Sequence, residues 1–130
     1  MAFVHPVPVR FFEVDLQGVV FNMWYLGWFD DAMTAYLGHL GFPYDVMKRA
    51  GWDVQLVHTE VDWHDGIRFG DTAGVEVTTD RIGTTSFTLA FRVLRGEDVV
   101  VSATTVYVVV GIDGSGKRVV PDDVRNALAV

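Results

Sequence analysis

The sequence contains no cysteine in its 130 residues. This absence excludes disulfide bonds, a thiolate nucleophile and metal sites built on cysteine. It also has no apolar run of the roughly 18 residues that a membrane-spanning helix needs. The N-terminal stretch "MAFVHPVPVRFF" lacks the basic start and long apolar centre of a signal peptide. We therefore expect a cytoplasmic protein.

Positive charge is also scarce, with 10 Lys and Arg residues against 17 Asp and Glu, and a net charge of -7. Nucleic-acid-binding proteins usually carry a basic patch, so this balance argues against that class. Apolar residues are abundant at 50%, with 13% aromatic, which excludes a disordered chain. Without a linker or an internal repeat, we expect residues 1–130 to form one domain.

The residue pattern predicts a strand near 5–14, at a sheet edge because Pro6 and Pro8 cannot donate to a ladder. From Asn22 the apolar spacing becomes helical, and Asn22 is a suitable N-cap. This helix is apolar around most of its circumference, which is typical of a buried helix. Residues 43–51 predict a short second helix.

The remaining sequence predicts four consecutive antiparallel strands, at 52–63, 72–82, 84–95 and 98–111, and a short helix at 121–128. Helices and strands that are segregated in this way favour an α+β domain. The last strand is nearly all Val, which indicates burial on both faces. We therefore expect a second subunit to cover its outer face.

The most specific motif is "EVDLQGVVFNMWYLGWFDDA", which joins the first strand to the long helix. It places two acids, Glu13 and Asp15, before a run of spaced residues: Gly18, Val19, Val20, Asn22, Tyr25, Leu26, Phe29 and Asp30. Further pieces are "FGD" at 69–71, "SF" at 86–87 and Pro121. Together they resemble the 4-hydroxybenzoyl-CoA thioesterase family of hot-dog acyl-CoA thioesterases.

The resemblance implies a five-stranded antiparallel sheet wrapped around one long central helix, assembled into homo-oligomers, dimers or tetramers. It implies hydrolysis of an acyl- or aroyl-CoA thioester without a cofactor or a metal. Asp15 matches the catalytic carboxylate, and the backbone N–H of Tyr25 matches a group that polarises the thioester carbonyl. We expect the substrate to contact Gly18, Val19, Asn22 and Trp24.

Simple chemistry is consistent with these roles. A carboxylate can attack a thioester directly or activate water, and thiolate leaves readily. The first N–H groups of a helix lack intrahelical partners and carry partial positive charge, so they can stabilise an oxyanion. If the Asn22 side chain caps the Tyr25 N–H, however, that donor is occupied. We expect Glu13 to be a surface residue at the end of a strand.

Two features leave alternatives open. The turn "IGTTSF", which is basic in some members of the family, has only Arg81 nearby. A carrier-protein thioesterase of a polyketide or fatty-acid pathway, and a non-catalytic acyl-thioester-binding subunit, therefore remain alternatives. His58, Glu60, Asp62 and His64 alternate along one strand, but at about 3.3 Å per residue they span too far for one metal ion. We expect them to form a polar outer face.

Overall fold

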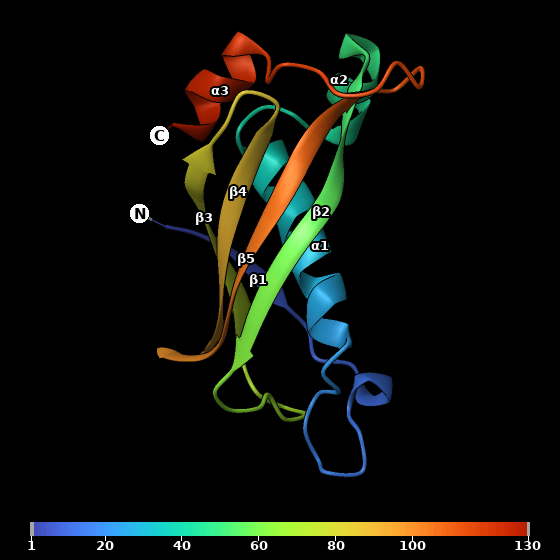
Figure 1. Ribbon diagram of the computed structural model, residues 1–130. Helices are drawn as coiled ribbons and strands as arrows, with labels where there is room; N and C mark the ends of the chain where they lie inside the picture. Colours follow the sequence, from blue (N-terminus) through green and yellow to red (C-terminus); the bar gives the residue numbers. More distant parts are fainter. Residues whose placement is uncertain (1, 130) are drawn as a thin grey trace.

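The computed structural model describes residues 2–129 and contains one antiparallel sheet with a long helix across one face (Figure 1). The strands lie in the order β1-β3-β4-β5-β2. Their bounds are β1 Phe3–Val7, β2 Trp52–Trp63, β3 Ala73–Ile82, β4 Ser86–Arg95 and β5 Asp98–Gly111. The helices are α1 Trp24–His39, α2 Tyr44–Ala50 and α3 Asp122–Leu128, with a 3-10 turn η1 at Phe11–Glu13. The predicted α+β architecture of five strands and one long helix is confirmed.

The first strand is shorter than the predicted strand over 5–14. β1 ends at Val7, and Val14 makes only an isolated bridge to Val20. The prediction was wrong at this end because Pro8 cannot donate to a ladder, and η1 turns the chain away from the sheet. β1 does lie at an edge, as its prolines predict, and pairs only with β3.

Helix α1 buries one face and leaves the other exposed. The buried residues recur at helical spacing and face the sheet: Tyr25, Trp28, Phe29, Ala32, Met33, Tyr36 and Leu37. Trp24 and Leu26 remain 40% and 42% exposed. The prediction of a helix buried all round is therefore wrong for a single chain. Exposed apolar side chains of this size mark a surface that another molecule can cover.

Strand β2 does not continue into a hairpin with β3, as four consecutive strands would suggest. It pairs with β5 at the far edge of the sheet, with a register shift at Val57. Residues 64–72 therefore lead from β2 at one edge of the sheet to β3, next to the other edge, and pass below the start of α1 in the view of Figure 1. This crossing loop meets the motif that joins β1 to α1.

The two faces of β5 differ. Val101, Ala103, Thr105, Tyr107 and Val109 are buried against the helix side, whereas the residues between them are half-buried. The expected second subunit on the outer face stays a prediction. Within residues 2–129 we find no helix that is long and apolar enough to cross a membrane.

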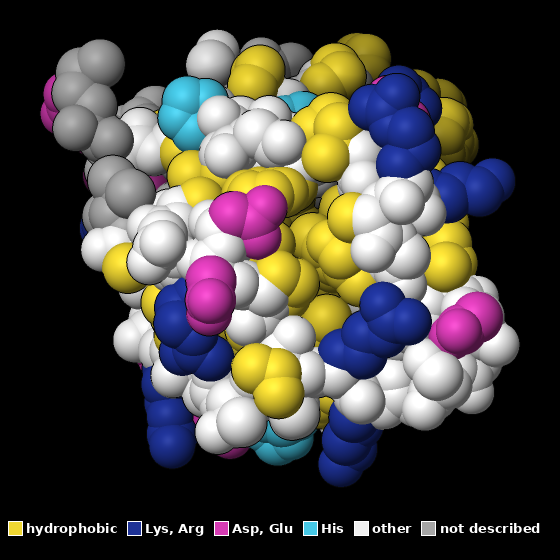
Figure 2. Space-filling model, turned by 90° about the horizontal axis from the view of Figure 1, so that it is seen from above, with side chains coloured by type: hydrophobic (Ala, Val, Ile, Leu, Met, Phe, Trp, Pro, Cys, Tyr) yellow, Lys and Arg dark blue, Asp and Glu magenta, His cyan; other side chains and the backbone are white. Residues whose placement is uncertain are grey.

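The short helices α2 and α3 lie at the opposite end of the molecule from the Asp15 motif (Figure 1). Gly51 ends α2 in the left-handed conformation, with φ 87°, as its position after the predicted helix suggests. Viewed from this end, apolar side chains gather in a hollow that has Lys and Arg side chains on either side (Figure 2).

Candidate active site

Asp15 lies in a tight turn immediately before α1. Its carboxylate Oδ1 accepts a hydrogen bond from the Gln17 N–H at 2.8 Å, and its own N–H donates to the Val19 carbonyl at 2.9 Å. Gly18 adopts φ 79°, a left-handed conformation that other residues rarely take. These contacts hold the half-buried Asp15 side chain in a defined turn.

Glu13 is buried, with 7% of its surface exposed, so the expectation of a surface residue was wrong. Its Oε1 accepts from the Arg10 N–H at 2.8 Å and its Oε2 from the Trp28 indole N–H at 2.9 Å. The Glu13 carbonyl also accepts from the Phe21 N–H at 2.9 Å. Glu13 therefore fastens the segment before Asp15 to α1.

The start of α1 has no side-chain cap. The helix begins at Trp24 with Met23 at the N-cap position, so the prediction that Asn22 is the N-cap was wrong. Trp24 N–H donates to the Phe21 carbonyl and Leu26 N–H to the Met23 carbonyl, but Tyr25 N–H has no acceptor among residues 2–129. The Asn22 side chain therefore does not cap this N–H.

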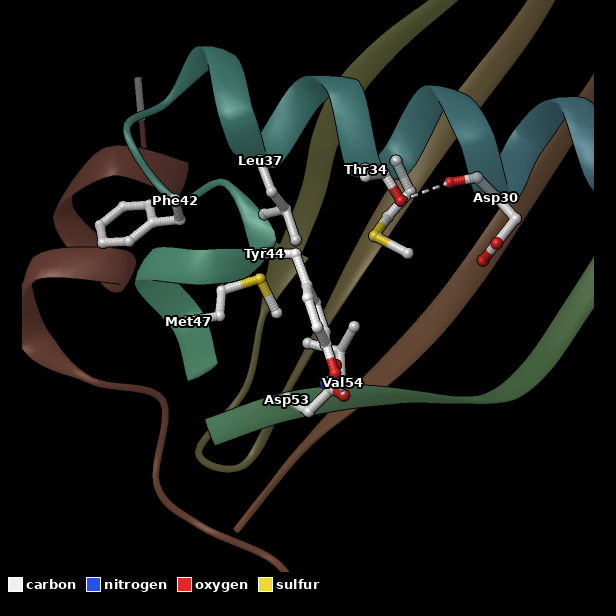
Figure 3. A pocket seen from close by; sticks show the side chains of 9 residues that line it. Asp30, Thr34, Leu37, Phe42, Tyr44, Met47, Asp53 and Val54 are labelled. Atoms are coloured by element: carbon white, nitrogen blue, oxygen red, sulfur yellow. Dashed lines mark hydrogen bonds between the residues drawn. The ribbon is translucent and has the colours of Figure 1, made fainter. Parts of the chain in front are cut away.

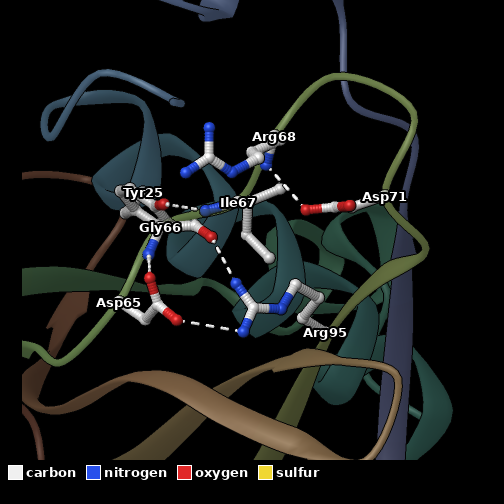
Figure 4. A network of polar contacts seen from close by, with 7 residues as sticks. All are labelled: Tyr25, Asp65, Gly66, Ile67, Arg68, Asp71 and Arg95. Atoms are coloured by element: carbon white, nitrogen blue, oxygen red, sulfur yellow. Dashed lines mark hydrogen bonds and ion pairs between the residues drawn. The ribbon is translucent and has the colours of Figure 1, made fainter. Parts of the chain in front are cut away.

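The Tyr25 ring is buried and ties α1 to the crossing loop (Figure 4). Its hydroxyl accepts from the Ile67 N–H at 3.2 Å, while the Ile67 carbonyl accepts from the Val20 N–H at 2.8 Å. Burial raises the pKa of the Tyr25 hydroxyl, the Ile67 N–H lowers it, and the carboxylates of Asp65 and Asp15 raise it. Val20, just after the Asp15 turn, and the Tyr25 side chain are therefore both bonded to Ile67.

Arg95 at the end of β4 braces the crossing loop (Figure 4). Its guanidinium donates to the Gly66 carbonyl at 2.9 Å and to the Asp65 carboxylate at 3.0 Å. The Gly66 N–H and Arg95 together lower the pKa of Asp65, and the hydrogen bond to Asp65 raises the pKa of Arg95. This brace was not predicted, since no local pattern links these residues.

The predicted substrate contacts fall into two groups. Gly18 and Val19 lie in the turn that packs on the crossing loop, where a Cβ at Gly66 would come within 2.7 Å of Val19 Cγ1. Trp24 and Asn22 lie at the exposed start of α1, and Trp24 makes an edge-to-face contact with Phe12 at 5.5 Å between ring centroids.

Among the cavities beside α1, two bear on the site. One of about 210 Å³ lies between α1, α2 and the start of β2, and its lining includes Asp30, Thr34, Leu37 and Tyr44 (Figure 3). The other, of about 380 Å³, lies between α1 and the segment that joins β1 to η1. Its lining includes Glu13, two residues before Asp15, and Trp24, the residue before Tyr25.

The alternating strand residues are separate from this site. His58 pairs with Glu60 at 3.1 Å, and His64 lies 3.1 Å from the Ser102 hydroxyl. Among residues 2–129, no three His, Asp or Glu side chains are grouped closely enough to hold a metal ion.

A family model described as "Thioesterase-like superfamily" matches residues 9–128. The chain belongs to the thioesterase-like superfamily. This confirms the predicted hot-dog fold and the class of thioester hydrolases. The finer assignment to the 4-hydroxybenzoyl-CoA thioesterase family stays a prediction.

Similar proteins of this superfamily span nearly the whole chain. A relative in Aquifex aeolicus (strain VF5) with an esterase name is 28% identical over 129 residues, which cover 98% of both chains. A 1,4-dihydroxy-2-naphthoyl-CoA hydrolase of Synechococcus sp. (strain CC9605) is 25% identical over 122 residues, which cover 89% of this chain and 82% of the relative. The structure of a 1,4-dihydroxy-2-naphthoyl-CoA thioesterase from Synechocystis shares the fold, with a TM-score of 0.86 at 19% identity over 99% of this chain and 96% of that chain.

Proposed function

We propose that this thioesterase-like protein hydrolyses an acyl- or aroyl-CoA thioester to the free acid and CoA. The observation that supports the proposal is a shared support: Val20, just after the Asp15 turn, and the Tyr25 side chain both hydrogen-bond to Ile67 of the crossing loop. Asp15 is held in a turn by the Gln17 N–H, and the Tyr25 N–H at the start of α1 has no acceptor among residues 2–129. The names of relatives as CoA-thioester hydrolases support the same reaction.

In this proposal the thioester carbonyl oxygen binds the Tyr25 N–H. Asp15 either takes a proton from an attacking water or attacks the carbonyl carbon itself, giving a mixed anhydride that water then cleaves. In both routes the C–S bond breaks and CoA leaves as its thiolate. One donor that stabilises such an oxyanion contributes about 2.7–4 kcal/mol in other enzymes. The partial positive charge at the start of α1 adds to this effect.

A carrier-protein thioester is the second candidate, because positive charge is scarce near the turn between β3 and β4. Arg81 is exposed there, while Arg125 donates to the Gly83 carbonyl at 2.6 Å. A thiol-release assay that compares an acyl-CoA with the same acyl group on a carrier protein separates the two substrates. The absence of release from either would favour a non-catalytic binding subunit.

We further propose that the protein acts as a homo-oligomer in the cytoplasm, with the dimer as the basic unit. β2 is a 12-residue edge strand whose outer edge is unpaired within residues 2–129. Leu56, Val57 and Trp63 on it are 53%, 56% and 46% exposed. A second copy of the chain would satisfy the free backbone groups and cover these side chains.

Replacing Asp15 by Asn tests the catalytic role. The amide oxygen of Asn can still accept from the Gln17 N–H, so we expect an unchanged fold. Hydrolysis should fall by roughly 100-fold or more, because the group can no longer act as a base or nucleophile. The measurement is kcat/KM for CoA release over a panel of acyl-CoA thioesters, with thermal unfolding as the folding control.

Asp113→Asn is the matched control, since Asp113 Oδ1 accepts from the Ser115 N–H at 3.0 Å in the same kind of turn. Asp113 lies in the loop after β5, at the α2 end of the molecule, so this variant should retain full activity. An Asp15→Asn enzyme as fast as the unmodified protein would eliminate Asp15 as the catalytic group.

A further inference from the structure

Gly27 is the fourth residue of α1, inside the helix, where glycine lowers helix stability by roughly 1 kcal/mol relative to alanine. Its backbone needs no positive φ, since only Gly18, Gly41, Gly51, Gly70, Gly96, Gly114 and Gly116 have one among the described residues. A Cβ built at Gly27 meets no other heavy atom within 4 Å. Neither the backbone nor the packing of the described chain therefore requires glycine here.

The space that Gly27 leaves open belongs to the cavity of about 380 Å³ between α1 and the η1 segment. Trp24, Gly27, Trp28 and Asp31 line one side of it, at the spacing of a single stripe along the helix. Phe12 lines the opposite side and contacts the Trp24 ring. The cavity is larger than the roughly 150 Å³ that accommodates one benzene molecule in an engineered protein core.

The shape of this cavity is fixed by buried hydrogen bonds. Glu13 joins the Trp28 indole N–H on α1 to the Arg10 N–H on the facing segment, and Glu13 is 7% exposed. Both walls are therefore held in place before anything binds. Phe12 and Trp24 are nevertheless 63% and 40% exposed, so the aromatic lining is open to solvent. The lining combines the aromatic side chains of Phe12, Trp24 and Trp28 with the charged residues Arg10, Glu13 and Asp31. Pre-formed clefts that combine apolar side chains with placed polar groups are typical of small-molecule sites.

The cleft also borders the first residues of α1. Trp24 directly precedes Tyr25, and Gly27 is only about 3 Å further along the helix axis than Tyr25. The cavity on the other side of α1 starts at Asp30, about 7.5 Å along the axis, and extends away toward α2. The Gly27 cleft is thus the nearer of the two to a carbonyl bound at the Tyr25 N–H.

We propose that the Gly27 cleft holds the acyl group of the thioester, and that Gly27 makes room for a bulky apolar acyl group such as an aryl or medium-length chain. This inference rests on the proposed thioesterase function. Glycine at position 27 lowers the stability of the helix, and the absence of a side chain there leaves space for the substrate. A side chain at this position would fill the cleft without disturbing the protein around it.

The test compares Gly27→Leu with Gly38→Leu, the same change at another α1 glycine that has nothing within 4 Å of its Cβ position. Acetyl-CoA, benzoyl-CoA and octanoyl-CoA are the probes, and kcat/KM is measured for each. The unmodified protein should prefer the two larger acyl groups over acetyl. Gly27→Leu should lower kcat/KM for them by about tenfold or more and leave acetyl within about threefold, and Gly38→Leu should change none.

An equal effect of Gly27→Leu on all three substrates, or no effect, would overturn the acyl assignment while leaving the thioesterase intact. A preference of the unmodified protein for acetyl-CoA would do the same. If the folded protein hydrolyses no thioester, the proposed function fails and the acyl assignment with it. Gly27→Ala provides the folding control, since it should raise the melting temperature as expected for a helix glycine replaced without a clash.

Discussion

At the scale of single residues, Glu13 is a buried hydrogen-bond acceptor that links two segments, although its position in the motif suggests a surface residue. Its two carboxylate oxygens accept from two different donors, Arg10 N–H and Trp28 Nε1–H. Glutamine has only one oxygen, so Glu13→Gln leaves one of these donors facing an amide NH₂. We expect the free energy of unfolding to fall by about 1–3 kcal/mol, measured by chemical denaturation.

Glu60→Gln is the control for this prediction, because Glu60 is exposed and pairs only with His58. We expect its effect to stay within about 0.5 kcal/mol. The Trp28 indole also offers a spectroscopic readout of the lost bond. If Glu13→Gln is as harmless as Glu60→Gln, then the buried brace does not hold the η1 segment in solution.

At the scale of elements, the Asp15 turn and the crossing loop fit together around Gly66. A Cβ at Gly66 would lie 2.7 Å from Val19 Cγ1 and 3.0 Å from Val19 Cβ, closer than real side chains approach. Gly66→Ala must therefore push the turn away from the loop. Because small displacements at a reaction centre cost as much as 100-fold in rate, we expect kcat/KM to fall by about tenfold or more.

The double variant Val19→Ala/Gly66→Ala shows whether the contact is the cause. Removing the two Val19 methyl groups clears the closest atom, so part of the lost activity should return. The coupling between the two positions is the quantity to measure, through kcat/KM of both single variants and the double variant. Strictly additive losses would mean that Gly66 acts on the site by some other route.

The sequence predicted the elements whose signals are local. The bounds of β3, β4, β5, α2 and α3 follow the expected ranges to within two residues. The prediction failed where contacts between residues far apart in the sequence determine the structure. The bond between Ile67 and Tyr25 joins residues 42 positions apart, and the pairing of β2 with β5 has no signal in either strand. Glu13 was misread for the same reason, because its partner Trp28 lies on the next element.

At the candidate site, too, local features were predicted and contacts between distant residues were not. The motif identified Asp15 and the start of α1 as neighbours, since only a short turn separates them. It did not identify the Asp65–Arg95 brace, which joins the crossing loop to the end of β4 across 30 residues. The open space beside Gly27 was equally hidden, because a glycine in a helical pattern does not show what lies next to it. A cavity is a property of the packed molecule.

At the scale of the whole molecule, the two edges of the sheet differ in what they leave exposed. β1 has five residues, contains Pro6 and leaves only Val4 as a large exposed apolar side chain. β2 is more than twice as long, and Leu56 and Val57 are both more than half exposed. We therefore expect a dimer that pairs the two β2 edges antiparallel, with the exposed side of α1 covered in part by the second copy.

Charge at this edge should separate the copies. Leu56→Asp places a carboxylate against its own copy near the centre of β2, where burial without a partner is costly. We expect sedimentation to report a monomer for this variant and a dimer, or a tetramer of two dimers, for the unmodified protein. Val4→Asp on the other edge strand is the matched control and should leave the assembly unchanged. A monomeric unmodified protein would contradict the proposed dimer. Dissociation by Val4→Asp alone would show that the interface is not at β2.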